Sequence, residues 1–304
     1  MHILEDKFNE YNWNYKRVLG KNKPYILKNS ITIGIIDSGI DINNPCVSSH
    51  IISGDSLIEH SSPFEDITGH GTQVFGVIDT LIKNVEYRIY KIMNDEKTNS
   101  LLLIKAIIKA VDEGVDILNI SLGIYKDKSK KTDALVIQSF NKAINYAKDN
   151  DVVIISSAGN NGEDLDSKDN LIHFPGDHPY VVNVGSTNKN TSISSYSNFG
   201  STLNLLAPTG QWIEKDGKIL FSEMILTYGQ AKGFVKKIND FCNIPYELVL
   251  SYGTSLAPPQ VVAAFALVKD KYSPINLEEW KKIVYNNSEF LETKNSELKE
   301  VRIK

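Results

Sequence analysis

Short apolar runs rich in β-branched residues alternate with longer amphipathic stretches along most of the chain, and this alternation limits the possible folds more than any other feature. The apolar runs are continuous, as in strands that are buried on both faces of a parallel sheet. Between them, apolar residues recur with the spacing of one helix face, as at Ile107, Ala110 and Val111. The pattern predicts an α/β fold. The predicted strands cover residues 31–36, 87–92, 116–120, 152–156, 181–184 and 203–206, and the predicted helices cover about 70–82, 100–113, 134–149, 255–271 and 276–286.

The alternation continues almost to the end of the 304 residues, and no proline-rich or serine-rich linker interrupts it. We therefore expect a single domain over residues 1–304. Residues 209–250 are the exception, because glycines and aromatic side chains replace the alternating pattern there. A segment of this length inside a domain is typical of a functional insertion.

Composition argues against several classes of protein. Hydrophobic residues make up 41% of the chain and charged residues 23%, as in ordinary globular domains. The net charge of −4 argues against a protein that binds nucleic acid. No apolar run approaches the roughly 20 residues that a membrane-spanning helix needs. The first residues lack the basic and apolar regions of a secretory signal, so we expect a cytoplasmic protein with no membrane partner.

Three polar residues stand next to glycines at the ends of predicted elements. Asp37 ends the first predicted strand, His70 opens a predicted helix between two glycines, and Ser255 precedes a pair of prolines on the first turn of another helix. Each has an ordinary structural interpretation when taken alone. Asp37 would be a turn residue, His70 a buried structural histidine and Ser255 a helix N-cap.

The order Asp, His, Ser along the chain gives the three residues a joint interpretation. A serine hydroxyl is a weak nucleophile and needs a neighbouring base to accept its proton. That base needs an acid that fixes its tautomer and stabilises the imidazolium. Ser255 would be the nucleophile, His70 the base and Asp37 the orienting acid.

The motifs around these residues resemble those of the subtilisin-like serine proteases, and the resemblance covers nearly the whole chain. It implies a three-layer α/β/α fold with a mainly parallel central sheet, and a triad of Asp37, His70 and Ser255. It also implies that Asn160 donates to the oxyanion together with the Ser255 N–H. The matching segments, in order, are Asp37-Ser-Gly-Ile40, Gly69-His-Gly-Thr72, Asn119-Ile-Ser-Leu-Gly123, Ala158-Gly-Asn160, Tyr196-Ser-Asn-Phe-Gly200, Leu206-Ala-Pro208 and Gly253-Thr-Ser-Leu-Ala257.

The resemblance also implies where a peptide substrate binds. Ser121, Leu122 and Gly123 resemble the edge strand that pairs with the substrate backbone. The pocket for the residue before the scissile bond would be lined by 121–123, by 156–160, which includes Ala158 and Gly159, and by about 172–174. His173 at its base would favour a polar residue, whereas three nearby acids would favour a basic one, and both alternatives remain open. The acids are Asp164, Asp166 and Asp169.

No cofactor or metal is expected. Many members of this family carry a calcium-binding loop after the helix of the catalytic histidine, but here residues 78–87 run almost directly from predicted helix to predicted strand. We therefore expect that calcium site to be absent. Cys46 and Cys242 lie far apart without a CxxC pattern, so neither a disulfide framework nor a thiolate metal site is expected.

Asp37 falls so early that we expect a bare catalytic domain without export signal or propeptide. This resembles the lantibiotic leader peptidases, a subgroup with a non-histidine residue at the positions of Gln73 and Gln260. The implied function is removal of the leader from a lanthionine-containing precursor peptide. A general intracellular subtilisin-like protease and a catalytically silent binding module are the alternatives. The basic segment 126–131 would attract an acidic leader, or is simply a solvated loop.

Overall fold

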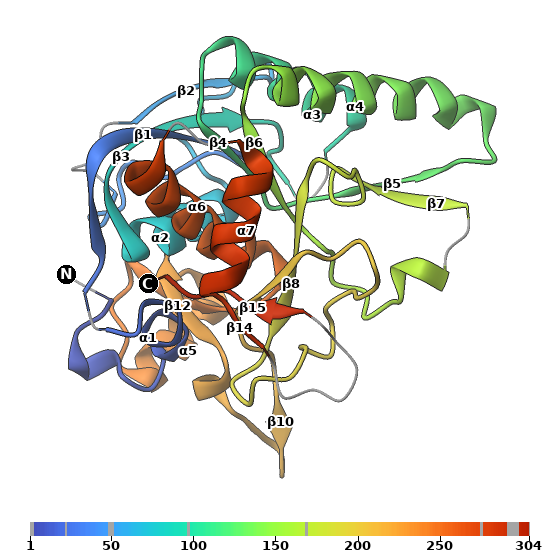
Figure 1. Ribbon diagram of the computed structural model, residues 1–304. Helices are drawn as coiled ribbons and strands as arrows, with labels where there is room; N and C mark the ends of the chain where they lie inside the picture. The colour runs from blue at the N-terminus through green and yellow to red at the C-terminus, as the bar shows by residue number, and fades with distance from the viewer. Residues whose placement is uncertain are drawn as a thin grey trace.

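The computed structural model describes residues 3–21, 23–47, 52–95, 98–167, 170–273, 276–290 and 298–303. Within these ranges nine strands form one sheet in the order β14-β15-β9-β8-β6-β4-β1-β3-β2, and all neighbouring strands except β14 and β15 run parallel (Figure 1). The strands are β1 (Tyr25–Asp37), β2 (Ile52–Ser56), β3 (Ile82–Lys91), β4 (Ile117–Ile120), β6 (Val153–Ser157), β8 (Val182–Thr187), β9 (Leu205–Pro208), β14 (Glu289–Phe290) and β15 (Lys299–Glu300).

Helices cover both faces of the sheet, which makes the three layers expected from the sequence (Figure 1). Alternate strand residues face the two layers, because successive side chains of a strand point to opposite faces. Ile117 belongs to the core under α2 and α6, whereas its neighbour Leu118 belongs to the core under α3 and α4. The helices are α1 (Trp13–Leu19), α2 (His70–Leu81), α3 (Ser100–Asp112), α4 (Lys131–Asp149), α5 (Gly233–Cys242), α6 (Pro258–Tyr272) and α7 (Leu277–Asn287).

The carboxyl ends of the central strands gather the residues that matter for chemistry. Strand β1 ends at Asp37, β4 is followed by Ser121, and β6 is followed at a short distance by Asn160. The register pairs Ile36 with Ile120, and Ile120 with Ser156, so these strand ends lie next to one another. The carboxyl edge of an open α/β sheet is where such folds place their sites.

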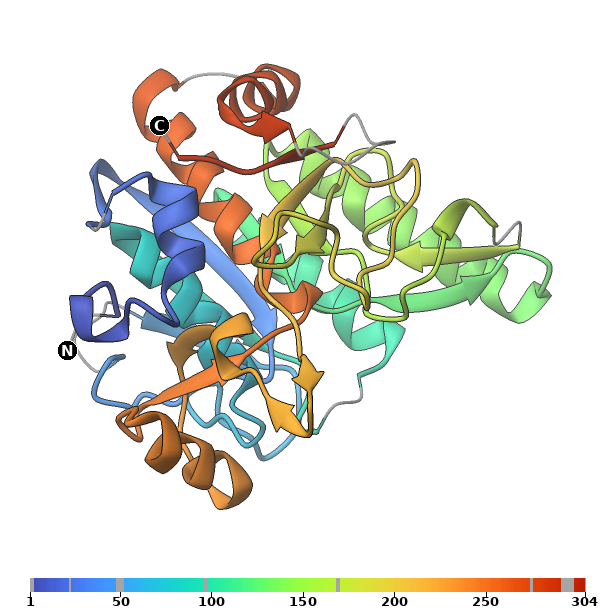
Figure 2. The same cartoon turned by 90° about the horizontal axis from the view of Figure 1, so that it is seen from below.

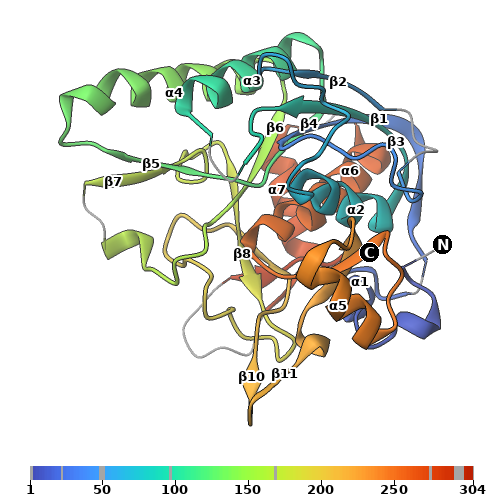
Figure 3. The ribbon, with the colours of Figure 1, turned by 180° about the vertical axis from the view of Figure 1, so that it is seen from behind.

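Three smaller strand pairs of the described residues stand outside the main sheet, and two of them lie outside residues 225–251. The antiparallel pair β5 (Ile124–Asp127) and β7 (Leu171–Phe174) forms an arm that projects from the body of the molecule, seen from below in Figure 2. The pair β10 (Glu214–Lys215) and β11 (Lys218–Ile219) forms a hairpin at the edge of the molecule in Figure 3. Short 3-10 turns are η1 (Asp6–Phe8), η2 (Leu165–Ser167), η3 (Phe221–Glu223) and η4 (Thr254–Leu256).

The sequence-predicted insertion 209–250 has a structure of its own. Strand β12 (Ile225–Tyr228) pairs antiparallel with β13 (Leu248–Ser251), and α5 lies between them along the chain. Strand β13 leads directly into the turn η4, which contains Ser255. The segment therefore delivers the predicted nucleophile rather than merely decorating the surface.

Candidate active site

Asp37 and His70, which the sequence analysis places in a triad, form a hydrogen-bonded pair. The Nδ1 atom of His70 lies 2.7 Å from Oδ1 of Asp37. Asp37 is fully buried, whereas 29% of the His70 side chain remains exposed. Gly71 permits this approach, because a Cβ atom there would lie 2.0 Å from the Gly39 carbonyl oxygen and 3.3 Å from the Asp37 Cβ. The first turn of α2 thus packs directly onto the end of β1.

A second carboxylate, Asp66, holds the start of α2 in place, and the sequence analysis missed it. Its Oδ2 accepts from the Thr72 N–H at 2.8 Å and from the Thr72 hydroxyl at 2.6 Å. Its Oδ1 lies 2.8 Å from the Ser38 hydroxyl, which in turn accepts from the Gly71 N–H at 3.0 Å. These bonds satisfy amides that a helix N-terminus leaves free. An acid four residues before His70 was the available signal.

Ser255 lies in the turn η4, which contacts α2, β6 and β8. The sequence predicts a helix from 255, but α6 begins at Pro258 and Ser255 precedes it. Pro258 and Pro259 occupy the first positions of α6, where the missing N–H groups cost nothing. Ser255 itself is partly exposed while Thr254 and Leu256 on either side are buried. Only the middle residue of the turn therefore faces outward.

Asn160 is anchored beside Ser255 with its amide group in a defined orientation. Its Oδ1 accepts from the N–H and the hydroxyl of Thr254, at 2.8 and 2.7 Å. A Cβ atom on Gly253 would lie 3.5 Å from the Ser255 Oγ and 3.8 Å from the Asn160 Nδ2, so both atoms face the same space. Among the described residues no backbone acceptor is recorded for the Ser255 N–H. Two N–H donors are thus available next to the serine hydroxyl.

Ser121, Leu122 and Gly123 connect β4 to the projecting arm, and none of the three belongs to a strand. The sequence predicts an edge strand here, but strand assignment requires a paired neighbour. Within the described part of the chain no backbone-to-backbone hydrogen bond of 121–123 is recorded, although the Leu122 carbonyl accepts from the Ser156 hydroxyl at 3.5 Å. The Ser121 side chain serves the nucleophile turn instead, because its Oγ donates to the Ser255 carbonyl at 2.6 Å and accepts from Asn119 at 2.9 Å.

The sequence model of the subtilase family, peptidase family S8, matches residues 28–301. The chain belongs to the subtilase family. It is 27% identical to the epidermin leader peptide-processing serine protease EpiP of Staphylococcus epidermidis over 86% of its length, and 28% identical to the nisin leader peptide-processing serine protease NisP of Lactococcus lactis subsp. lactis over 92%. These matches span only 65% and 47% of the two relatives.

Solved structures agree with this assignment. The crystal structure of a lanthipeptide protease superposes with a TM-score of 0.86 at 27% identity, covering 98% of this chain and 94% of that one. The three-layer fold is therefore the subtilisin-like fold that the sequence predicts.

The loop after β6 in this subtilase is shaped by Asn198. Its Nδ2 donates to the Ala158 carbonyl at 2.9 Å, and its backbone N–H donates to the Gly159 carbonyl at 3.0 Å. Gly159 has a φ of +98°, and a Cβ atom there would lie 2.6 Å from the Asn198 amide nitrogen. A side chain at this position would displace Asn198, so the loop that leads to Asn160 requires glycine.

His173 is buried next to the unpaired segment 121–123. A Cβ atom on Gly123 would lie 1.9 Å from the His173 Nε2, and the imidazole centre is 4.8 Å from the ring centre of Tyr125. Burial lowers the pKa of His173 below its ordinary value, and the carboxylate of Asp177 opposes this shift. The Nδ1 atom of this buried ring has no hydrogen-bond partner among the described residues. His173 is thus a neutral polar group under Gly123.

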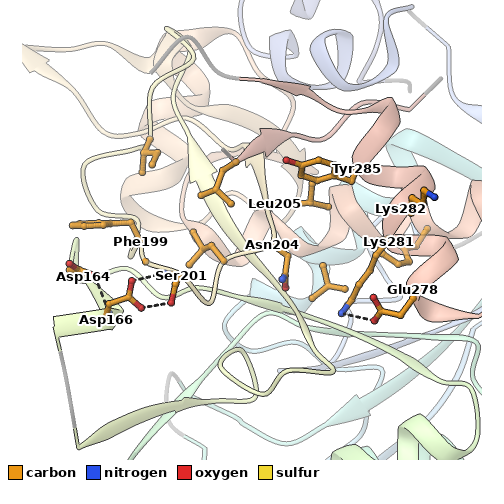
Figure 4. A pocket seen from close by; sticks show the side chains of 16 residues that line it. Asp164, Asp166, Phe199, Ser201, Asn204, Leu205, Glu278, Lys281, Lys282 and Tyr285 are labelled. Atoms are coloured by element: carbon orange, nitrogen blue, oxygen red, sulfur yellow. Dashed lines mark hydrogen bonds and ion pairs between the residues drawn. The ribbon is translucent and has the colours of Figure 1, made fainter. Parts of the chain in front are cut away.

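Two of the predicted pocket acids lie elsewhere. Asp164 and Asp166 line a cavity of about 1230 Å³ between the segment that follows Asn160 and α7 (Figure 4). The carboxylate of Asp166 accepts from the N–H and the hydroxyl of Ser201, both at 2.7 Å. None of the triad residues lines this cavity. Asp169 lies outside the described residues.

Residues 209–250 connect the two halves of the site. Strand β12 packs on α2, since a Cβ atom on Gly76 would lie 2.7 Å from atoms of Thr227 and Tyr228. The Thr227 hydroxyl donates to the Gln73 carbonyl at 2.7 Å. The Tyr228 hydroxyl donates to the buried carboxylate of Asp79, also at 2.7 Å. Strand β12 therefore packs on the helix of His70, and β13 leads to the turn that carries Ser255.

No group of three or more His, Cys, Asp and Glu side chains suited to a metal ion occurs in the described part of the molecule. Helix α2 ends at Leu81 and β3 begins at Ile82, so no loop separates them. The absence of a calcium site remains a prediction. Across the same described ranges, no helix combines the length and the apolar character needed to cross a membrane.

Proposed function

We propose that this subtilase is a serine endopeptidase that uses Asp37, His70 and Ser255 as its triad. The observation that carries the proposal is the bonded Asp37–His70 pair next to a turn in which Ser255 alone faces outward. His70 would accept the Ser255 proton as the hydroxyl attacks the peptide carbonyl. Asp37 would hold the proton on Nδ1 and stabilise the imidazolium.

The tetrahedral intermediate that forms carries a negative oxygen. The Asn160 Nδ2 and the Ser255 N–H would donate to it, and such fixed donors stabilise charge that develops in the transition state. His70 then gives its proton to the leaving amine, and the carbonyl carbon stays bonded to Ser255 Oγ as an ester. Water activated by His70 hydrolyses this ester and frees the enzyme.

The substrate backbone would pair with residues 121–123 by adding a strand to their N–H and C=O groups, which pair with no other backbone group in the described residues. The side chain before the scissile bond would then lie near Ala158, Gly159 and the buried His173. A neutral imidazole favours a polar partner, and the two acids that would favour a basic one line another cavity. Cleavage of a peptide library that varies the residue before the scissile bond tests this preference. We expect His173→Phe to lose the preference for polar residues at that position. An unaltered preference would show that His173 does not line the pocket.

We further propose that the substrate is a lantibiotic precursor and that the reaction removes its leader. The printed names of EpiP and NisP, leader peptide-processing serine proteases, support this substrate class. The test is incubation of candidate precursor peptides with the protein, followed by mass spectrometry. A single cleavage between leader and core supports the proposal, whereas random fragments would refute it.

The two alternatives make different predictions. A general intracellular protease would digest unfolded casein to small peptides, but a leader peptidase would leave most of it intact. A catalytically silent binding module would not react with a fluorophosphonate probe. Labelling that is lost in Ser255→Ala, but kept in Ser129→Ala on the exposed segment before α4, rules the silent module out.

Cytoplasmic residence remains a prediction. Cys46 and Cys242 are both free thiols, which suits a reducing compartment. Fractionation of the producing cells would test it, since activity confined to the medium or the membrane fraction would contradict it.

A further inference from the structure

The hydroxyl of Tyr196 lies at the centre of a buried group of polar contacts. One of these contacts is to the backbone of Gly253, two residues before the nucleophile Ser255. The Tyr196 hydroxyl is 3.0 Å from the Gly253 amide nitrogen and 2.7 Å from the Gly210 carbonyl oxygen. The hydroxyls of Ser186 and Thr209 lie 2.8 and 2.9 Å from it. A phenol accepts from the Gly253 N–H while donating its proton to the Gly210 carbonyl. Burial raises the pKa of Tyr196, so its proton is retained at neutral pH.

Gly253 needs such a contact because its backbone is unusual. Its φ of 131° and ψ of 153° lie in a region that is essentially restricted to glycine. Glycine also has the greatest conformational freedom to lose on folding. Without the phenol, the Gly253 N–H would be a buried donor with no partner, which costs as much as a lost hydrogen bond.

The contacts of the nucleophile turn follow one another along the chain. Tyr196 holds the N–H of Gly253, Asn160 holds the N–H of Thr254, and Ser121 holds the carbonyl of Ser255. The Tyr196 hydroxyl also joins the turn to Gly210, near the start of the segment 209–250.

We infer that Tyr196 is a positioning residue: its hydroxyl fixes the backbone of Gly253 and thereby aims the Ser255 hydroxyl and N–H at the substrate carbonyl. This inference rests on the proposed function only for its catalytic consequence. The contact to Gly253 itself exists whether or not the protein is a protease.

The test compares Tyr196→Phe, which removes only the hydroxyl, with two controls. Ser186→Ala removes another member of the same buried group but leaves the contact to Gly253. Tyr146→Phe removes a hydroxyl that is bonded to Asp112 on the surface of α4. The rate of Ser255 labelling by a fluorophosphonate is measured for each, together with kcat and KM on a cleaved peptide and hydrogen exchange of the peptide that spans 251–256.

In Tyr196→Phe we expect labelling and kcat to fall about tenfold to 100-fold, with KM changed less than threefold. Exchange of the Gly253 amide should rise at least tenfold. Both controls should stay within threefold of the parent protein in every measurement. Equal losses in Ser186→Ala would assign the effect to the buried group as a whole and overturn the inference, as would an unchanged Tyr196→Phe.

The exchange measurement separates this inference from the proposed function. If the parent protein fails to react with the probe, the proposed function is wrong, but faster exchange at Gly253 in Tyr196→Phe still supports the structural half of the inference. If the parent protein reacts and Tyr196→Phe changes neither labelling nor exchange, the inference alone fails.

Discussion

The side-chain oxygen of Asn160 accepts two hydrogen bonds from Thr254, one from its N–H and one from its hydroxyl, so only the amide NH₂ group of Asn160 is left for a substrate. The neighbour of the nucleophile thus fixes the orientation of the oxyanion donor.

Replacing Asn160 by Ala should lower kcat by about 10² to 10³ with little change in KM. The magnitude is borrowed from the corresponding loss in subtilisin, where one oxyanion donor was removed. Thr254→Val keeps one of the two bonds and should cost less. Steady-state kinetics on a cleaved peptide measure both, and equal losses in the two variants would contradict the arrangement.

Asp37→Asn should abolish most activity without unfolding the protein. The amide would present its NH₂ group to Nδ1 and favour the wrong tautomer of His70, a change that costs about 10⁴ in kcat in other serine proteases. Asp55→Asn on β2 is the matched control, because its exposed carboxylate pairs with Lys109 at the surface. An Asp37→Asn protein that keeps more than a tenth of the activity would exclude the proposed triad.

Asp66→Asn should reduce both stability and kcat. The substituted side chain keeps one oxygen acceptor but loses the charge at the start of α2, which is worth about 1 kcal/mol or more at a buried N-terminus. The expected free energy of unfolding is therefore lower by about 1–2 kcal/mol, measured by urea denaturation. Activity that is unchanged after correction for the folded fraction would show that Asp66 serves stability alone.

Burial of His173 makes stability depend on pH. Its pKa is lowered in the folded chain, so below its ordinary value of 6.5 the unfolded chain binds a proton that the folded chain resists. The free energy of unfolding should therefore fall as the pH drops from 7 to 5, by at most about 1.4 kcal/mol per pH unit for one such group. His178, whose pKa burial also lowers, adds to the same trend. His173→Gln should flatten the slope of the free energy of unfolding against pH, and a slope unchanged in this variant would reject burial of His173 as its cause.

If the basic segment 126–131 attracts an acidic leader, it should raise kcat/KM for acidic peptides through long-range electrostatic attraction. Lys128, Lys130 and Lys131 are exposed at the end of the projecting arm. Changing all three to Gln should lower kcat/KM for acidic peptides several-fold at low salt and little at 0.5 M salt, because salt screens exposed charges. The same change at Lys232, Lys236 and Lys237 removes equal charge elsewhere. If both triple variants show the same salt dependence of kcat/KM, segment 126–131 is a solvated loop with no role in attracting the leader.

The sequence predicts the central sheet and its flanking helices well, because both depend on local patterns. The strands expected at 31–36 and 152–156 overlap β1 and β6, and the helix expected at 70–82 is α2. Glycines at element ends also carry a local signal, which is enough to propose the triad, and the triad remains a prediction. The pairing of β12 with β13 was not predictable, because it joins residues 20 to 26 positions apart inside a segment without clear alternation.

The residues that support the site could not be predicted from the sequence, because their contacts join distant parts of the chain. The Tyr196 hydroxyl meets Gly253 across 57 positions, and the Ser121 hydroxyl meets the Ser255 carbonyl across 134. Such contacts depend on how loops from different strands meet at one edge of the sheet. Composition and local spacing do not indicate which loops come into contact. These residues were therefore either missed or, like Ser121, assigned a different role.

The most direct test of the central claim is the intact mass of a lantibiotic precursor peptide after incubation with the protein and, in parallel, with Ser255→Ala. We predict two products whose masses sum to that of the precursor plus one water, with the cut between leader and core, and no products from Ser255→Ala. An uncleaved precursor, or equal cleavage by both proteins, would contradict the account.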